Sequence, residues 1–239
     1  DHRDLHLSLR RQRQMCIRDR CVINLLAESC SLKYDLPQIQ EEIKINQIDA
    51  EKSWKKLFNN KVGFISNNKN KPELIFPGSF NPLHEGHLKM KELAEKKTGM
   101  HTTFEICAKN ADKPPLTFYE IKRTIDQFQN DESWMLTSAG RFSEKVEMFP
   151  NSVFIIGADT LLRVFDEKFY KSHKDMMEHI QRFNDHNINF LVFGRKVNKK
   201  FISLDKIKVP EIIKSRCTGF EEASFRDDIS STELRLTKD

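Results

Sequence analysis

The stretch ELIFPGSFNPLHEGHLKM, residues 73–90, joins a short apolar run to a glycine-containing turn and then to a helical pattern. The run ELIF is typical of a buried strand, which we expect at residues 73–76. Gly78 lets the backbone turn sharply after that strand, and Gly86 lets the backbone approach a ligand closely. Apolar residues then recur at helical spacing over residues 86–97. The stretch therefore predicts one strand–turn–helix unit.

The same alternation continues along the chain. We expect further strands at residues 102–108, 133–137, 152–156 and 188–193, and further helices at 117–128, 140–149 and 173–184. Strands that alternate with helices are typical of a doubly wound parallel sheet. The expected fold class is therefore α/β, a Rossmann-like doubly wound parallel sheet with a mainly helical N-terminal extension. In such sheets ligands bind beyond the carboxyl ends of the strands.

The N-terminal extension is expected to cover residues 21–71. Its apolar residues recur at roughly helical spacing, and the polar run NNKNKP (67–72) ends in proline as a linker would. The run LAESC (26–30) resembles part of the deamidase family of competence-damage proteins, which some larger proteins carry upstream of a second domain. We expect this segment to be a remnant of such an upstream domain, and we transfer no function from it.

Residues 1–20 differ in composition from the rest of the chain. They hold six Arg, no Lys and three Asp, so they contribute +3 of the net charge of +5. The stretch RQRQMCIRDR (11–20, with Met15) resembles translated adapter sequence at the ends of assembled transcripts. We expect a non-native or disordered tail; a basic arm or a targeting peptide is the alternative. The three Asp residues argue against a transit peptide.

Composition excludes several classes of protein. The 239 residues are 31% charged and 38% hydrophobic, and no apolar run approaches the roughly 18 to 20 residues of a membrane-spanning helix. The five cysteines are scattered without CxxC spacing, which favours reduced thiols and a cytoplasmic location. Without the tail the net charge is only +2, with no basic stripe, so nucleic-acid binding is the weakest hypothesis. The sequence does not indicate an oligomeric state.

His84 and His87 lie where the expected helix begins. A helix start offers unpaired N–H groups and a positive dipole end, which together favour an anion. Two imidazoles there can donate hydrogen bonds to phosphate oxygens. A His-x-x-His pair alone is also found as surface decoration or as half of a metal site. Zinc would need further ligands, and the other His and Cys residues form no matching cluster, so we predict no metal held by protein ligands.

With its prefix, the string GSFNPLHEGH (78–87) resembles the signature of the nucleotidylyltransferase superfamily, and it is most similar to nicotinamide/nicotinate mononucleotide adenylyltransferase-type, cytidylyltransferase-like domains. A second signature of that superfamily is matched by ISSTELR (229–235) near the C-terminus. Its Ser230 and Glu233 also have the spacing of a capping box, so the segment is expected to open a helix. The resemblance covers about residues 72–236, and we expect residues 72–239 to be the nucleotidyltransferase domain.

The resemblance implies roles for particular residues. It makes His84, His87 and Arg235 catalytic. It assigns nucleotide binding to Gly78, Ser79, Phe80, Asn81, Gly86, Gly157, Asp159, Arg195, Ser231 and Thr232. It assigns acceptor binding to Lys113, in the run NADKPPL (110–116). Gly157-x-Asp159 also fits an ordinary turn, and Arg195 and Lys113 also fit solvated surface positions.

The chemistry that the resemblance implies needs few catalytic groups. An acceptor phosphate attacks the α-phosphorus of a nucleoside triphosphate, expected to be ATP with Mg²⁺ as cofactor, and expels pyrophosphate. Because the nucleophile is already ionised, positioning and charge stabilisation carry the reaction. The acceptor is a phosphorylated small molecule, with nicotinamide or nicotinate mononucleotide first. The alternatives are a cytidylyltransferase, a phosphopantetheine-type adenylyltransferase and a non-catalytic nucleotide-binding regulatory module.

The acceptor is left open by one departure from the family pattern. Pyridine-mononucleotide enzymes usually carry a tryptophan downstream of the Gly-x-Asp segment, near the nicotinamide-type ring. Here the corresponding stretch has only Phe165, Phe169 and Tyr170. Stacking on a ring could survive on these residues.

Overall fold

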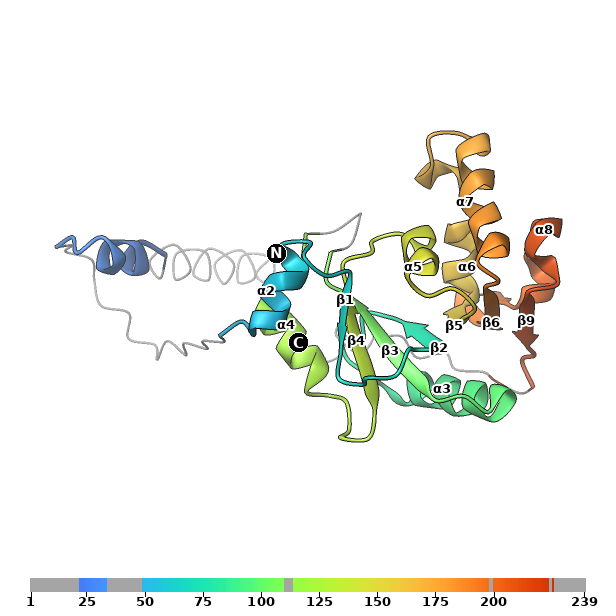
Figure 1. Cartoon of the computed structure of the whole chain (residues 1–239), viewed down its shortest axis with the longest axis horizontal. Helices are drawn as coiled ribbons and strands as arrows, with labels where there is room; N and C mark the ends of the chain where they lie inside the picture. The colour runs from blue at the N-terminus through green and yellow to red at the C-terminus, as the bar shows by residue number, and fades with distance from the viewer. Residues whose placement is uncertain (1–21, 34–48, 110–113, 198–199, 224, 226–239) are drawn as a thin grey trace, which may run out of the picture. The chain divides into compact units, whose positions relative to one another are not determined.

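The computed structural model describes residues 22–33, 49–109, 114–197, 200–223 and 225 (Figure 1). The chain divides into two compact units, Asp1–Gln47 and Ile48–Asp239. The described part of the first unit is a helix over residues 22–29 and the turn after it. The second unit contains the sheet and every element discussed below. No helix among the described residues is long and apolar enough to cross a membrane.

One seven-stranded sheet organises the second unit. Its strands are β1 (Phe64–Ser66), β2 (Leu74–Pro77), β3 (Thr102–Cys107), β4 (Ser133–Thr137), β5 (Val153–Gly157), β6 (Asn189–Phe193) and β9 (Cys217–Phe220). They lie in the order β1-β4-β3-β2-β5-β6-β9. All neighbours are parallel except β1, which runs antiparallel to β4. The predicted doubly wound, Rossmann-like α/β fold is confirmed.

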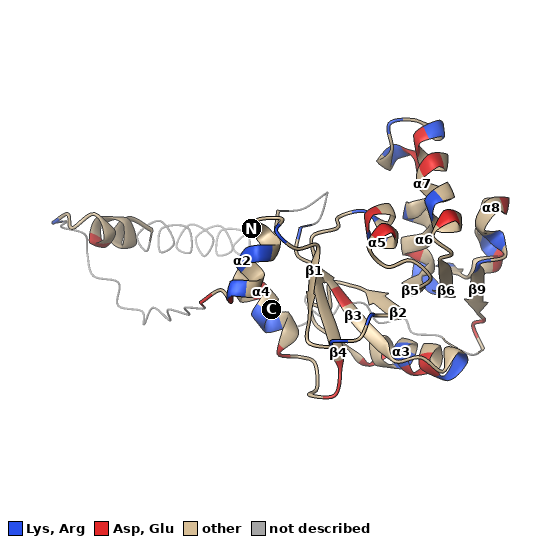
Figure 2. Cartoon of the chain, viewed as in Figure 1, with Lys and Arg blue, Asp and Glu red and all other residues tan. Residues whose placement is uncertain are grey.

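Helices cover both faces of this sheet (Figure 1). They are α2 (Lys52–Phe58), α3 (Glu85–Thr98), α4 (Phe118–Ile125), α5 (Phe142–Met148), α6 (Ala158–Val164), α7 (His173–Asp185) and α8 (Glu211–Lys214). Residues of α2, α3 and α4 pack into one apolar cluster, and residues of α5, α6, α7 and α8 pack into the other. Figure 2 shows the charged residues concentrated on the helices, while the strands are mainly uncharged.

The strands supply both clusters because successive side chains point to opposite faces. On β6, Phe190 and Val192 belong to the α5–α8 cluster, whereas Leu191 and Phe193 belong to the α2–α4 cluster. A strand buried on both faces is usually apolar on both, which explains the run FLVF at residues 190–193. The sheet is therefore the middle layer between two cores.

The compact unit begins before residue 72, where we expected the domain to begin. Strand β1 pairs with β4, with Ile65 opposite Leu136. Helix α2 buries Trp54, whose ring stacks on Phe118 of α4 with centroids 6.1 Å apart. Residues 48–66, which we had placed in the helical extension and linker, thus contribute one helix and one edge strand to the sheet unit. The physical reason is that the apolar face of α2 covers one core.

Several elements were not among the expected ones. They are β1, α6, the hairpin of β7 (Arg195–Val197) and β8 (Lys200–Ile202), two 3-10 turns (Glu167–Phe169 and Leu204–Lys206), α8 and β9. The remaining strands and helices lie where the hydrophobic pattern places them, within a few residues at each end.

The strand order defines where a ligand would bind. Strands β2 and β5 are neighbours at the centre, with β3 beyond β2 and β6 beyond β5. The direction in which strands are added reverses between β2 and β5, and that is the switch point at which open α/β sheets form a crevice. The segments after β2, β5 and β6 therefore converge at one edge of the sheet.

Candidate active site

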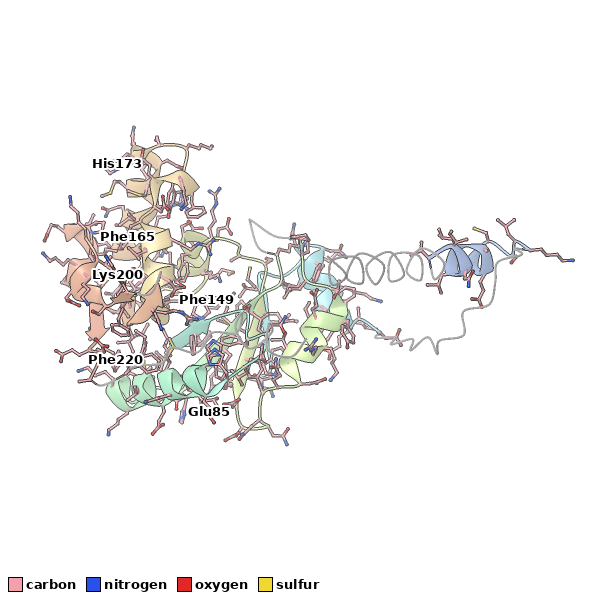
Figure 3. All side chains as sticks on the ribbon, turned by 180° about the vertical axis from the view of Figure 1, so that it is seen from behind. Glu85, Phe149, Phe165, His173, Lys200 and Phe220 are labelled. Atoms are coloured by element: carbon pink, nitrogen blue, oxygen red, sulfur yellow. The ribbon has the colours of Figure 1, made fainter. Side chains whose placement is uncertain are left out.

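The first wall of the site is the start of α3, which begins at Glu85 (Figure 3). His84 is the N-cap residue, with extended backbone angles of −144° and 168°. The rings of His84 and His87 stack with their centroids 3.7 Å apart. The edges of Phe76 and Phe80 approach His87 from the core side, at centroid distances of 5.8 and 5.2 Å. Both imidazoles are thus held in place by the first helical turn and by aromatic neighbours.

His87 is uncharged at neutral pH. Burial, together with electrostatic repulsion from His84 and Arg195, lowers its pKa to about 3. A neutral imidazole can donate one hydrogen bond and accept another. The Nδ1 atom of His87 is buried and hydrogen-bonds to nothing in the described part of the chain. A buried polar atom without a partner is costly unless a ligand completes it, so this atom is suited to meet a bound group.

The loop that leads into α3 depends on Gly78 and Phe80. A Cβ added at Gly78 would lie 2.5 Å from the Phe80 ring, so only glycine leaves room for that ring. Phe80 has a positive φ of 43°, and its side chain is only 1% exposed. Its ring packs on Phe104. Because the side chain is buried, only the backbone of Phe80 could contact a nucleotide. Ser79 is exposed and Asn81 is half-buried at the same edge.

Gln127 holds this loop from the end of α4, and no motif in the sequence singles it out. Its Nε2 donates to the carbonyl oxygen of Phe80 at 2.8 Å. Its Oε1 accepts from the backbone N–H of Leu83, also at 2.8 Å. The amide therefore links two points of the loop, 44 to 47 residues away along the chain.

The second wall comes from the ends of β5 and β6. Gly157 ends β5, and a Cβ there would lie 2.4 Å from Oδ1 of Asp159 and 3.7 Å from Cδ of Arg195. Glycine at this position lets the Asp159 carboxylate lie back over the strand end. Nε of Arg195, the first residue of β7, lies 3.9 Å from that carboxylate oxygen. The pair is partly exposed, so both groups remain accessible to a ligand.

A small cavity joins the two walls at the switch point. Its lining residues are His84, Gly86, Met90, Gly157, Phe193, Gly194, Arg195 and Phe225. Four of these, His84, Gly86, Gly157 and Arg195, were predicted to bind nucleotide or to act on it. Phe225 was not predicted; it is buried, and its ring meets the ring of Phe193 at 5.0 Å. Gly78, Ser79, Asn81 and Asp159 lie on the segments that lead into this cavity, and Lys113, Ser231, Thr232 and Arg235 lie outside the described residues.

A second cavity, of about 250 Å³, lies at the ends of β3 and β4 and beside α6. It is lined by Cys107, Gly140, Arg141, Phe142, Ser143, Lys145, Thr160, Arg163, Val164, Phe169 and Tyr170. Three basic side chains and three aromatic rings thus surround one space. This combination suits a ligand with a ring and an anionic group.

A buried ion pair forms part of this second cavity. Nζ of Lys145 lies 2.6 Å from Oε2 of Glu105, and the two side chains are only 8% and 1% exposed. The other carboxylate oxygen of Glu105 accepts a hydrogen bond from the Thr137 hydroxyl. Charges this deeply buried are tolerated only because they are paired and hydrogen-bonded. Burial also raises the pKa of the nearby Cys107 thiol, which keeps it protonated at neutral pH.

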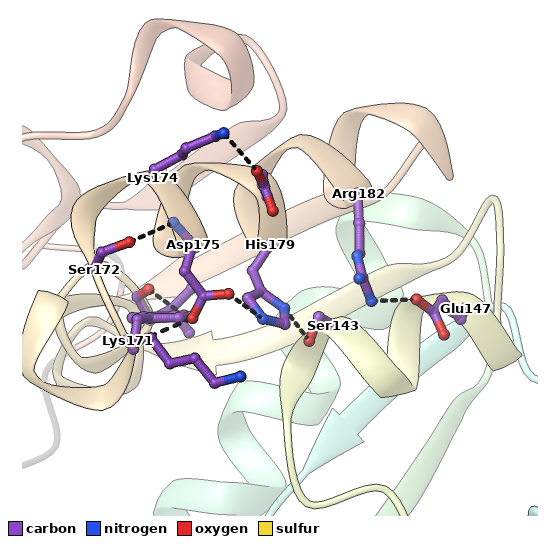
Figure 4. Close-up of polar contacts among 11 residues, drawn as sticks. Ser143, Glu147, Lys171, Ser172, Lys174, Asp175, His179 and Arg182 are labelled. Carbon is purple, nitrogen blue, oxygen red and sulfur yellow. Dashed lines mark hydrogen bonds and ion pairs between the residues drawn. The ribbon is translucent and has the colours of Figure 1, made fainter.

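Polar contacts between α5 and α7 support the wall of the second cavity (Figure 4). His179 Nδ1 lies 2.8 Å from the hydroxyl of Ser143, and its Nε2 lies 3.6 Å from Asp175 Oδ1. Arg182 forms an ion pair with Glu147 further along the same two helices. Helix α7 therefore holds α5 in place, although no residue of α7 lines the second cavity.

Comparisons with known proteins place the chain in a family. The cytidylyltransferase-like family matches residues 75–237. A Schizosaccharomyces pombe (strain 972) protein, named "Putative nicotinamide mononucleotide adenylyltransferase", is 30% identical over 178 residues, which are 69% of this chain and 70% of that protein. A solved structure of Plasmodium falciparum nicotinic acid mononucleotide adenylyltransferase complexed with NaAD has a TM-score of 0.39 and 18% identity, covering 70% of this chain and 83% of that one.

The family match covers most of the sheet unit, from the second residue of β2 to beyond β9. It includes both histidines and every described residue that lines the cavity at the switch point. The chain therefore belongs to the cytidylyltransferase-like family of the nucleotidylyltransferase superfamily, and it is a nucleotidyltransferase.

Proposed function

We propose that this protein transfers an adenylyl group from ATP to nicotinamide or nicotinate mononucleotide and releases pyrophosphate. One observation carries the proposal: His84, stacked on His87, lines one cavity with Arg195 and Gly157 at the switch point of the sheet. That site combines imidazole donors, a guanidinium and glycine backbone, as binding of a polyphosphate requires. The name of the Schizosaccharomyces pombe relative supports adenylyl transfer to nicotinamide mononucleotide over the alternatives.

In this proposal His87 binds phosphate as a neutral hydrogen-bond donor. Because the pKa of His87 is about 3, the imidazole does not serve as an acid at neutral pH, and it donates a hydrogen bond instead. The acceptor phosphate is already ionised, so no residue has to remove a proton from it. Arg195 contributes positive charge at the opposite wall. Catalysis is then the alignment of two anionic substrates together with stabilisation of the charge on the phosphorus being attacked.

Mg²⁺ enters this proposal with the nucleotide. The described residues hold no group of three His, Cys, Asp or Glu side chains able to bind a metal ion. Mg²⁺ commonly binds substrate phosphates and keeps several waters, and it would neutralise phosphate charge here. The residues at the site fit this arrangement because their N–H groups can donate hydrogen bonds to phosphate oxygens.

The second cavity is our proposed acceptor site. It lies at the same edge of the sheet as the histidine pair, beyond the ends of β3 and β4. Phe142, Phe169 and Tyr170 offer rings against which a pyridine can pack in place of the missing tryptophan. Arg141 and Arg163 offer charge for the phosphate or for a ring carboxylate, whereas Lys145 is paired with Glu105.

The test is pyrophosphate release by the full chain with Mg²⁺. ATP and CTP are each combined with nicotinamide mononucleotide, nicotinate mononucleotide and phosphopantetheine. We expect release with ATP and a pyridine mononucleotide, and its loss in His87→Ala. The exposed His101→Ala serves as the matched control and should keep the activity.

Two other results would replace the proposal. Release only with CTP, or only with phosphopantetheine, would assign the chain to another branch of the same superfamily. ATP binding without release in any combination would favour a nucleotide-binding module that does not turn over.

A further inference from the structure

Gln127 lies immediately after α4, next to the helix C-cap residue Asp126. A capping box stabilises the N-terminus of α4: the side chains of Thr117 and Glu120 each accept a hydrogen bond from the other's backbone N–H. It also packs Ile121 into the core. The position of Gln127 is therefore set by an element that belongs to neither wall of the nucleotide cavity.

The loop that Gln127 contacts leads directly to the histidine pair. Nε2 of Gln127 donates to the Phe80 carbonyl oxygen, and Oε1 accepts from the Leu83 N–H, both at 2.8 Å. A side-chain amide offers a donor and an acceptor side by side on one planar group, whereas an ionised carboxylate offers acceptors alone. The Leu83 N–H immediately precedes His84, the N-cap of α3, so this contact fixes how the chain enters the helix.

We infer that Gln127 is a positioning residue for phosphate binding by His84 and His87, and this inference rests on the function proposed above. Gln127 acts through the loop and touches no substrate. Its amide holds the two ends of the segment 80–83 in register, so that the stacked imidazoles stay beside the cavity that Arg195 lines. Misplacement of reacting groups by about 1 Å costs as much as 100-fold in rate.

The experiment compares Gln127→Glu, Gln127→Ala and a matched control, Gln129→Ala, in the full chain. Gln129 is an exposed glutamine two residues further on, and its side chain makes no contact with the loop among the described hydrogen bonds. In the Gln127→Glu variant, the ionised carboxylate still accepts from Leu83 but places a second acceptor against the Phe80 carbonyl. Once protonated, that carboxyl group again offers a donor.

We expect Gln127→Glu and Gln127→Ala to lower kcat/KM for ATP by about 10- to 100-fold, with melting temperatures that keep both variants folded at the assay temperature. Gln129→Ala should match the wild type. The activity of Gln127→Glu relative to wild type should rise as the pH falls from about 7 to about 5, because burial beside the Phe80 carbonyl should raise the pKa of the new carboxyl group above its ordinary value of about 4.3, and protonation then restores the donor. A purely structural role would not give this recovery.

The ring resonances of His84 and His87, assigned by NMR in the absence of substrate, provide a readout that does not depend on turnover. Shifts of both rings in Gln127→Ala, but not in Gln129→Ala, support the inference even if no substrate pair is turned over and the proposed function fails. Unchanged ring resonances, or wild-type kcat/KM in both Gln127 variants, would overturn it. Should Gln127→Ala not fold, the Gln127→Glu variant decides by the same two measurements.

Discussion

The lowered pKa of His87 makes the stability of this protein depend on pH in a definite direction. The folded chain binds a proton at His87 only near pH 3, whereas an unfolded chain binds it near the ordinary value of 6.5. Between these values the unfolded state binds more protons, so the free energy of unfolding falls as the pH falls. This part of the stability is fully present above pH 6.5 and is lost progressively as the pH falls toward 3.

The size of the effect follows from the same two values. Each pH unit below 6.5 costs about 1.4 kcal/mol through this one group, so lowering the pH from 7 to 5 removes about 2 kcal/mol. Other groups also titrate over this range, but they do so in wild type and in His87→Gln alike. The difference between the two proteins therefore isolates His87.

The assay is urea unfolding of the wild type, His87→Gln and His101→Gln at about pH 7 and about pH 5. We expect wild type and His101→Gln to lose about 2 kcal/mol more than His87→Gln on acidification. Equal losses in all three proteins, within about 0.5 kcal/mol, would mean that burial does not keep His87 neutral. That result would also refute the argument that His87 donates a hydrogen bond to phosphate as an uncharged imidazole.

Three further predictions concern other parts of the molecule. Lys145→Met should destabilise the fold by about 3–5 kcal/mol because it leaves the Glu105 carboxylate buried without its partner, and the double variant with Glu105→Gln should recover part of that loss in urea unfolding. Arg195→Ala should raise KM for ATP. It should also raise the pKa of His87 above 3, measured by NMR titration, because a nearby positive charge is removed. An unchanged or lower pKa of His87 would contradict the arrangement of the cavity. Trp54→Ala should cost about 3–5 kcal/mol in the same unfolding assay, and a loss below about 1 kcal/mol would show that α2 is not part of the folded unit.

The sequence predicted the main elements of the sheet because their signals are local. The strands β2, β5 and β6 contain short apolar runs, β3 (TTFEIC) has the β-branched and aromatic residues typical of a strand, and α3 and α7 carry long periodic patterns. Three-residue elements such as β1 have no period to detect. Helix α6 was missed because its first residues, in the Gly-x-Asp segment, were interpreted as a nucleotide-binding strand end, with an ordinary turn as the alternative. Strand β9 contains Gly219, which weakens any strand pattern.

The candidate site was predictable only where a motif carries it. The motif singles out His84, His87 and the glycines beside them. In the structure His84 stacks on His87 and lines one cavity with Gly86 and Gly157. Gln127 and Phe225 could not have been found in this way, because their contacts join segments far apart in the sequence. The pairing of Lys145 with Glu105 is likewise a property of the fold, since 40 residues separate the two.

The short strand β1 also protects the protein from association. A parallel sheet that ended at β4 would present unpaired backbone N–H and C=O groups to other chains, which invites edge-to-edge aggregation. Instead β1 pairs along β4, and the ring of its first residue, Phe64, packs edge-on against Phe149. A chain that began between residues 67 and 72 would lack β1, and the exposed edge of β4 would favour aggregation. Helix α2 and strand β1 therefore belong to the folded sheet unit.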